Sequence, residues 1–139
     1  MIFDKNAGSY IYLEEHEVIE INRRQMAEEG KKSILKEPGE LSIILESPYL
    51  ISFGVELYPT LWEKAACYLY KLTVAHVFEN ANKRTAFLAA YIFMRANGYI
   101  ITAERDVLYD FMLALADSIN PAGYEEAVAF IRRESVPVN

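Results

Sequence analysis

The sequence predicts an all-α fold, a compact bundle of about six helices with a small β-hairpin. Three observations lead to this expectation. Apolar residues recur at helical spacing over most of the 139 residues. A composition that is 53% hydrophobic and 24% charged is typical of a folded globular protein. No repeat, low-complexity tract or linker divides the sequence, so we expect one domain over residues 1–139.

The first expected helix starts near Glu14 and ends at Gly30, a residue suited to the left-handed position that follows many helices. Before it, Tyr10 to Leu13 is a candidate for a minor strand. The inner face of the helix carries residues at helical spacing, namely Val18, Ile19, Asn22 and Met26. His16 stands among glutamates, and we expect it at the surface of this helix.

A long helix is predicted to run toward His76, with Pro59 at its start. Its inner face carries Leu61, Ala65, Leu69 and Leu72. Cys67 lies on the same helix and is expected in the core. Residues 81–97 are apolar on nearly every face, as expected of a helix that other helices surround.

Two more helices are expected after Asn97-Gly98. Thr102 is a candidate cap for the first, and Asn120-Pro121 precede the second. Their apolar positions are Leu108, Phe111, Met112 and Leu115 in one, and Tyr124, Ala127, Val128 and Ile131 in the other. The C-terminal SVPVN is expected to be loose. The alternation in SFGVELY, from Ser52 to Tyr58, predicts one arm of a small hairpin or an extended flap.

Charge and composition exclude several classes of function. A net charge of −6 and a pI near 5.0 disfavour broad attraction to nucleic acid or to anionic membranes. The single Cys67 forms no internal disulfide, and Met1 opens no signal-peptide pattern. The apolar run from Ala86 to Met94 is too short to span a bilayer. We therefore expect a cytoplasmic protein without a nucleic-acid or membrane partner.

HVFENANKRTA, from His76 to Ala86, joins two helices that are predicted to be buried. A helix start presents unpaired N–H groups and the positive end of the dipole, so it is a natural anion site. Lys83 and Arg84 lie where the dipole disfavours cations, and a bound phosphate would offset that cost. Asn82 would hold a phosphate oxygen or fix the loop. His76, with an ordinary pKa of about 6.5, suits a general base. The alternative is a capped helix start with a solvated Lys-Arg pair.

The stretch HVFENANKRTAF closely resembles the signature of the Fic/Doc family, in its death-on-curing (Doc) branch. The flanking ELYPTLWEKAACYLYKL and AAYIFMRANGY are similar to the segments around that signature, and PGELSIILESP is a looser match. The resemblance implies a Fic/Doc-like fold and a transferase that uses ATP, with His76 as the base. It assigns phosphate binding to Ala81, Asn82, Lys83 and Arg84. It also implies a flap that aligns the target by strand addition, formed by Phe53, Gly54, Val55, Glu56, Leu57 and Tyr58.

Two positions depart from patterns seen in the family. Asn80 stands where many members carry a carboxylate that helps to hold Mg²⁺, so it would be a weak metal ligand. Phe87 stands where adenylyl-transferring members carry a second arginine. The resemblance therefore favours transfer of a phosphoryl group to a protein hydroxyl, with a translation elongation factor as the target implied by the Doc branch. Adenylyl transfer remains an alternative, as does an inactive module that binds a nucleotide or a partner.

The resemblance also bears on regulation. Some family members carry an inhibitory helix that ends in glutamate followed by glycine or asparagine. The nearest match, Ser42 to Glu46, is followed by Ser47. We therefore expect an ordinary short helix here, and inhibition by a separate antitoxin protein.

Overall fold

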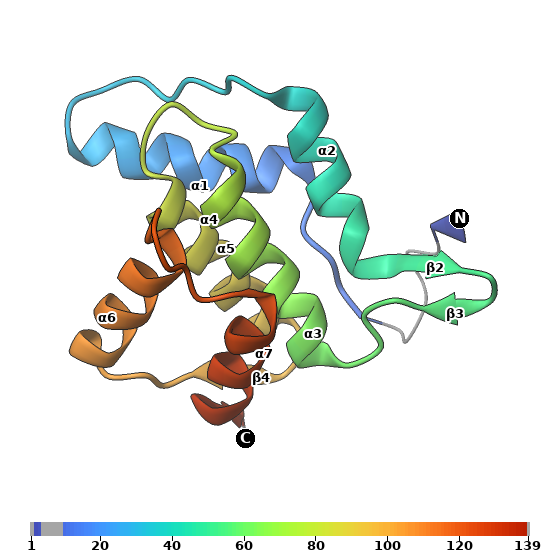
Figure 1. The fold of residues 1–139 in the computed structure, drawn as a ribbon. Coiled ribbons are helices and arrows are strands. Elements are labelled where there is room, and N and C mark those ends of the chain that lie inside the picture. The colour runs from blue at the N-terminus through green and yellow to red at the C-terminus, as the bar shows by residue number, and fades with distance from the viewer. Residues whose placement is uncertain (1, 4–9, 139) are drawn as a thin grey trace.

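The computed structural model describes residues 2–3 and 10–138, and most of them are helical (Figure 1). The helices are α1 Glu15–Glu28, α2 Pro38–Glu46, α3 Leu61–Ala66, α4 Leu72–Ala75, α5 Asn82–Ala96, α6 Arg105–Ala116 and α7 Tyr124–Arg133. A π-helical segment, Cys67–Lys71, joins α3 to α4, so that Leu61–Ala75 is one continuous helix. The expected all-α bundle is confirmed. Among the described residues, no helix is long and apolar enough to cross a membrane.

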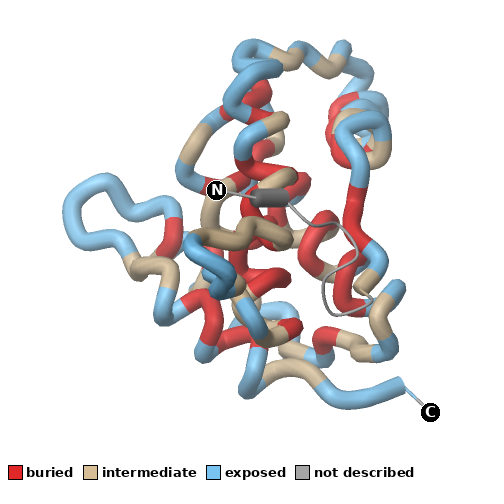
Figure 2. Tube along the Cα trace, turned by 90° about the vertical axis from the view of Figure 1, so that its right-hand side faces the viewer, coloured by how far each residue is buried: buried red, intermediate tan, exposed pale blue. Residues whose placement is uncertain are grey.

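Helix α5 is the central element of the bundle. It packs against α1, α3, α4 and the π-helical segment. Its small residues Ala86, Ala89 and Ala90 are fully buried and allow close helix packing, while Phe93 fills the core beside Tyr68. Figure 2 shows the buried residues gathered in the middle of the molecule. The predicted helix over residues 81–97 is thus confirmed, together with its surrounded position.

Helix α1 begins and ends as the sequence predicts. The side chain of Glu17 accepts a hydrogen bond from the Glu14 N–H at 3.0 Å, which satisfies a backbone group ahead of the first turn. At the other end, Gly30 adopts a left-handed φ of 69°, and the Lys31 N–H donates to the Met26 carbonyl at 3.0 Å. This Schellman arrangement ends the helix and directs the following loop back across the bundle.

The segment from Tyr10 to Leu13 is not a strand, contrary to the prediction. The side chain of Asn97 bonds both backbone groups of Ile11 at 2.8 Å, and the Leu13 N–H donates to the Tyr68 hydroxyl at 3.1 Å. These side chains satisfy the backbone groups that a neighbouring strand would otherwise bond.

Residues 135–137 of the C-terminal tail form a strand, so the prediction of a loose end was wrong for them; Asn139 lies outside the described residues. Strand β5, Ser135–Pro137, pairs antiparallel with β4, Tyr99–Ile101. The N–H of Thr102 bonds the Glu134 carbonyl at 2.7 Å rather than capping a helix, and α6 begins only at Arg105. Pairing with the end of α7 therefore determines the conformation around residue 102.

The small hairpin is present, and its turn lies inside the stretch predicted as one arm. Strands β2, Leu50–Ser52, and β3, Val55–Glu56, are joined by Phe53-Gly54, and β1, Ile2–Phe3, pairs with the other edge of β2. Phe53 and Gly54 have φ of 51° and 76°, as a two-residue hairpin turn of type I′ requires. The hairpin is anchored by the fully buried Lys64. Its ammonium donates to the Pro48 carbonyl at 2.8 Å and lies 3.3 Å from the Glu56 carboxylate.

Candidate active site

The motif loop, Val77–Asn80, is bracketed by two residues in the left-handed conformation. His76 ends α4 with φ 50° and ψ 49°, and Ala81 precedes α5 with φ 63° and ψ 29°. Neither is glycine, so each conformation carries a local cost that the surrounding contacts must offset. The two turns reverse the chain between the helices and leave His76 exposed beside the loop.

Asn82 holds the motif loop through its side chain. Its amide oxygen accepts from the Phe78 N–H at 3.1 Å, and its amide nitrogen donates to the Phe78 carbonyl at 2.9 Å. The ring of Phe78 is buried in the core. Of the two roles considered from the sequence, the geometry therefore supports loop fixation for the Asn82 side chain. Its backbone N–H remains part of the helix start.

The segment between α1 and α2 lies beside the motif loop (Figure 1). The N–H groups of Lys36 and Glu37 donate to the Val77 carbonyl at 2.8 and 3.1 Å. The Glu79 N–H in turn donates to the Ile34 carbonyl at 2.9 Å. Leu35 and Phe78 thus form an isolated antiparallel bridge. The motif loop is paired on one side like a short strand.

A buried asparagine of α1 connects these segments. Asn22 has no exposed surface, and its amide nitrogen donates to the Asn80 carbonyl at 2.9 Å and to the Thr85 hydroxyl at 3.1 Å. Its amide oxygen accepts a hydrogen bond from the Ser33 hydroxyl. The sequence placed Asn22 on the inner face of α1 but gave no sign of this role, because its partners lie 11 to 63 residues away.

The start of α5 is the candidate for the predicted anion site. By anion site we mean the backbone N–H groups of residues 82–84 with the side chains of Lys83 and Arg84. The Thr85 N–H bonds the Ala81 carbonyl at 2.9 Å, so the three preceding N–H groups come before the first α-helical hydrogen bond. Both cationic side chains are exposed. The site therefore combines backbone donors, the positive end of a helix dipole and two cations.

One of these cations already has a carboxylate partner. The Arg84 guanidinium donates to Glu29 at 2.7 Å, and both side chains are about half exposed. The hydrogen bond from Arg84 lowers the pKa of the Glu29 carboxyl below its usual value of 4.5, so the pair is intact at neutral pH. Glu29 thus occupies the place where an anion would bind Arg84.

A groove of about 410 Å³ adjoins the anion site between α5 and α6. Its floor is mainly apolar and its edge carries cations; the lining residues are Lys83, Arg84, Phe87, Arg105, Leu108, Tyr109, Met112 and Leu113. Phe87 is half-buried and lies against Tyr91, with 6.0 Å between ring centroids. Phe87, the position where the resemblance implies an arginine in adenylyl-transferring members, therefore faces an apolar groove in this protein.

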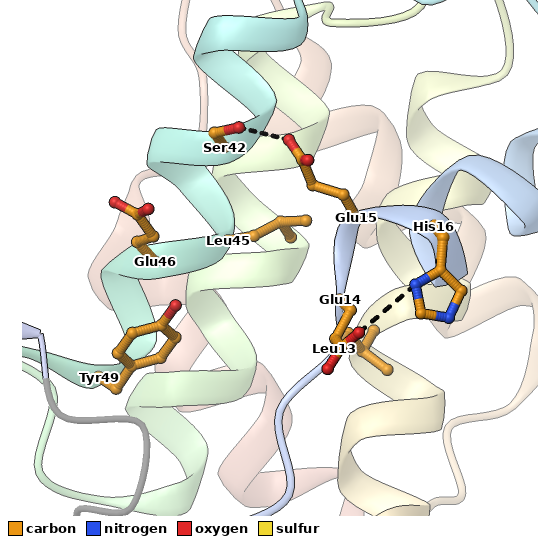
Figure 3. Close-up of a pocket in the computed structure, with 8 residues that line it drawn as sticks. All are labelled: Leu13, Glu14, Glu15, His16, Ser42, Leu45, Glu46 and Tyr49. Atoms are coloured by element: carbon orange, nitrogen blue, oxygen red, sulfur yellow. Dashed lines mark hydrogen bonds and ion pairs between the residues drawn. The ribbon is translucent and has the colours of Figure 1, made fainter.

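A second cavity, of about 440 Å³, lies between α1 and α2 and contains no residue of the motif (Figure 3). Glu14, Glu15 and Glu46 line it, and Glu15 accepts a hydrogen bond from Ser42. His16 lies 3.5 Å from Glu14 at the surface, as expected. Three carboxylates make this cavity unfavourable for phosphates.

The predicted flap does not lie beside the motif loop. Phe53–Tyr58 precede α3, whereas His76 follows α4, so the helix Leu61–Ala75 separates them by roughly 20 Å at 1.5 Å per residue. Figure 1 shows the β2–β3 hairpin away from the loop that joins α4 to α5. The Tyr58 hydroxyl accepts a hydrogen bond from Lys71 at 3.0 Å, five residues before His76 on the same helix. The segment that does lie beside the motif is the α1–α2 loop.

Neither the proposed metal ligand nor the single cysteine forms a preorganised site. The Asn80 side chain is exposed, while its backbone carbonyl is taken by Asn22. Within the described part of the chain, no three His, Cys, Asp or Glu residues are grouped to hold a metal. Burial raises the pKa of the Cys67 thiol to about 11, so this residue stays protonated in the core, as expected.

Comparison with known proteins assigns the family. The Fic/DOC family model matches residues 12–94, a region that includes α1, the α1–α2 loop, the motif loop and most of α5. Toxin Doc of Mycolicibacterium smegmatis is 37% identical over 78 residues, which are 56% of this chain and 60% of that protein. The chain therefore spans less than two thirds of the length of that relative. Because the family match covers more than half of the chain and includes the motif loop and the start of α5, this protein belongs to the Fic/DOC family.

Proposed function

We propose that this protein is a Doc-like toxin that transfers the terminal phosphoryl group of ATP to a hydroxyl group of a protein. The observation that carries the proposal is the arrangement of the motif loop. An exposed histidine ends one helix, and an anion site begins the next, with a short, firmly held loop between them. Similarity to Toxin Doc supports the role as a toxin.

In this proposal His76 is the general base. Its imidazole takes the proton of the target hydroxyl as the hydroxyl oxygen forms a bond to the γ-phosphorus. The bond from that phosphorus to the β,γ-bridging oxygen breaks, and ADP leaves with the electron pair. The N–H groups at residues 82–84, with Lys83 and Arg84, stabilise the charge on the transferred group.

The groove between α5 and α6 supports phosphoryl over adenylyl transfer. In the adenylylating orientation the outer phosphates would be held by an arginine at the position of Phe87. An apolar wall disfavours phosphate charge, whereas Phe87 and Tyr109 offer surfaces suited to a nucleoside. We therefore place the nucleoside in this groove and the terminal phosphate at the anion site.

The target segment is proposed to add to the α1–α2 loop rather than to the β2–β3 hairpin. Ile34 and Lys36 bond the motif loop, so in an extended segment the N–H and C=O of Leu35 point to the opposite edge. We name Ser33–Lys36 the docking strand. A target backbone bonded to Leu35 would lie next to the motif loop and bring a hydroxyl toward His76.

Magnesium and protein partners complete the proposal. The residues present fit the metal only weakly, because Asn80 offers one neutral amide oxygen where Mg²⁺ prefers carboxylates. The metal would neutralise phosphate charge, held mainly by phosphate oxygens. Similarity to Toxin Doc supports a separate antitoxin as a partner. The resemblance of the motif to the Doc branch suggests a translation elongation factor as the target, and the cytoplasm is the proposed location.

The test uses purified protein, a bacterial lysate and ATP labelled at either the γ- or the α-phosphate. We expect γ-label on a protein band. That transfer should be lost in His76→Ala while binding of a non-hydrolysable ATP analogue persists, since a general base contributes about 10²–10⁴-fold to the rate without holding the phosphates. Transfer of α-label would instead support adenylylation. Asn80 favours one further candidate, a nucleotide-binding module without catalysis, and nucleotide binding without transfer of either label would support it.

A further inference from the structure

We propose that Asn22 is a positioning residue that sets the docking strand in register with the anion site. The inference rests on the function proposed above and assigns a role within it. Asn22 is the one described side chain that bonds the docking strand, the motif loop and the first turn of α5 together, through Ser33, Asn80 and Thr85.

The chemistry of the three partners fixes the orientation of the Asn22 amide. A backbone carbonyl can only accept, so the Asn80 oxygen requires the amide nitrogen, which also donates to Thr85. The amide oxygen then faces Ser33, whose hydroxyl donates to it. Both amide N–H groups and the oxygen are therefore used, and no other uncharged side chain of this size presents the same pattern.

The burial of Asn22 indicates that these bonds have a specific purpose. Its neighbours on the inner face of α1 are the apolar Val18, Ile21 and Met26, and it is as inaccessible as Val18. An apolar residue would fill the same position without the cost of burying an amide. With asparagine at this position, a shift of either bonded loop would leave buried polar groups of Asn22 and its partners unpaired. The core therefore favours one arrangement of these loops.

The position of each partner gives the bonds a functional consequence. Asn80 directly precedes Ala81, whose left-handed turn aims the N–H groups of the anion site. Ser33 begins the docking strand, so its bond determines how far along the motif loop the target backbone lies. A single buried amide thus sets the distance between the attacking hydroxyl and the phosphorus, on which transfer rates depend steeply.

The test compares Asn22→Ala with Ser33→Ala and with Val18→Ala, a matched core truncation on the same helix. Calorimetry measures the Kd of a non-hydrolysable ATP analogue, and transfer of γ-label is followed against lysate concentration. We expect Asn22→Ala to raise both the Kd and the half-saturating lysate concentration by roughly tenfold, the effect of one buried hydrogen bond. Ser33→Ala should raise only the half-saturating lysate concentration. In a protein that already carries Asn22→Ala, Ser33→Ala should cause no further increase.

Val18→Ala should lower the Tm about as much as Asn22→Ala does, but leave the Kd and the half-saturating lysate concentration near their wild-type values. If Val18→Ala raised both constants as much as Asn22→Ala does, the inference would be overturned, because general destabilisation would then explain the changes in Asn22→Ala. Unchanged constants in Asn22→Ala, or additive effects of Ser33→Ala and Asn22→Ala, would overturn it too. Failure of the wild-type protein to transfer label would instead count against the proposed function. Hydrogen exchange at residues 78–81 would then test the coupling, with faster exchange expected in Asn22→Ala and not in Val18→Ala.

Discussion

Replacing Asn82 with alanine separates loop fixation from direct phosphate binding. The side chain makes two hydrogen bonds, of 3.1 and 2.9 Å, to the backbone of Phe78. The substitution leaves that buried N–H and C=O unpaired, at about 1.5 kcal/mol each or about 3 kcal/mol together. For 139 residues the unfolding entropy is about 0.3 kcal/mol/K, so the Tm should fall by about 10 °C.

The assay pairs thermal unfolding with calorimetric titration of an ATP analogue. We expect Asn82→Ala to lose stability and nucleotide affinity together, because the released loop no longer fixes the start of α5. Asn97→Ala is the control, since Asn97 makes the same reciprocal pair of bonds to the Ile11 backbone away from the motif, and it should lose stability alone. An Asn82→Ala protein with the wild-type Tm but weakened nucleotide binding would refute the reasoning and make Asn82 a direct phosphate ligand.

Three further predictions follow from the same contacts. Glu29→Gln should tighten binding of the ATP analogue at pH 7, because the Glu29 carboxylate competes with the analogue for Arg84. The lowered pKa of Glu29 keeps this carboxylate charged until the pH falls below 4.5. An unchanged affinity in Glu29→Gln would contradict the competition. Asn80→Asp should lower the Mg²⁺ concentration at which label transfer is half-maximal, and an unchanged requirement would exclude position 80 as a metal ligand. Glu56→Gln should remove the carboxylate that neutralises the buried Lys64 ammonium. We expect the Tm to fall by roughly 7 °C, about 2 kcal/mol, with no effect on label transfer. Lost transfer at an unchanged Tm would instead show that the hairpin takes part in the reaction.

Helical periodicity predicted most of the fold because packing and local preference agree over long segments. Val18 and Met26, for example, face the core as their spacing indicates. The errors fall where tertiary hydrogen bonds decide the conformation. The side chain of Asn97 replaces a neighbouring strand at Ile11, and β5 finds its partner β4 some 35 residues back in the sequence, beyond the reach of local patterns.

The candidate site was predicted unevenly for a related reason. The motif predicted that His76 ends one helix and that residues 82–84 begin the next, as the structure has them, because these residues lie within nine positions of one another. The flap was misplaced because strand alternation identifies a hairpin but not its neighbours in space. Asn22 was placed on the inner face of its helix but its role was missed, since the sequence gives no sign of which loops a buried polar residue bonds.

The π-helical segment Cys67–Lys71 allows the number of residues between the hairpin and the motif to differ among members of the family. A π-turn accommodates one more residue than the α-turn it replaces, while the helix on either side keeps its own contacts. Removal of a single residue here would convert the segment to ordinary α-helix. The helix would still begin after Thr60 and end at His76, and both ends would keep their present packing neighbours. Relatives that are one residue shorter between the hairpin and the motif are thus expected to share this architecture, and an alignment that puts their gap in a loop would misplace it.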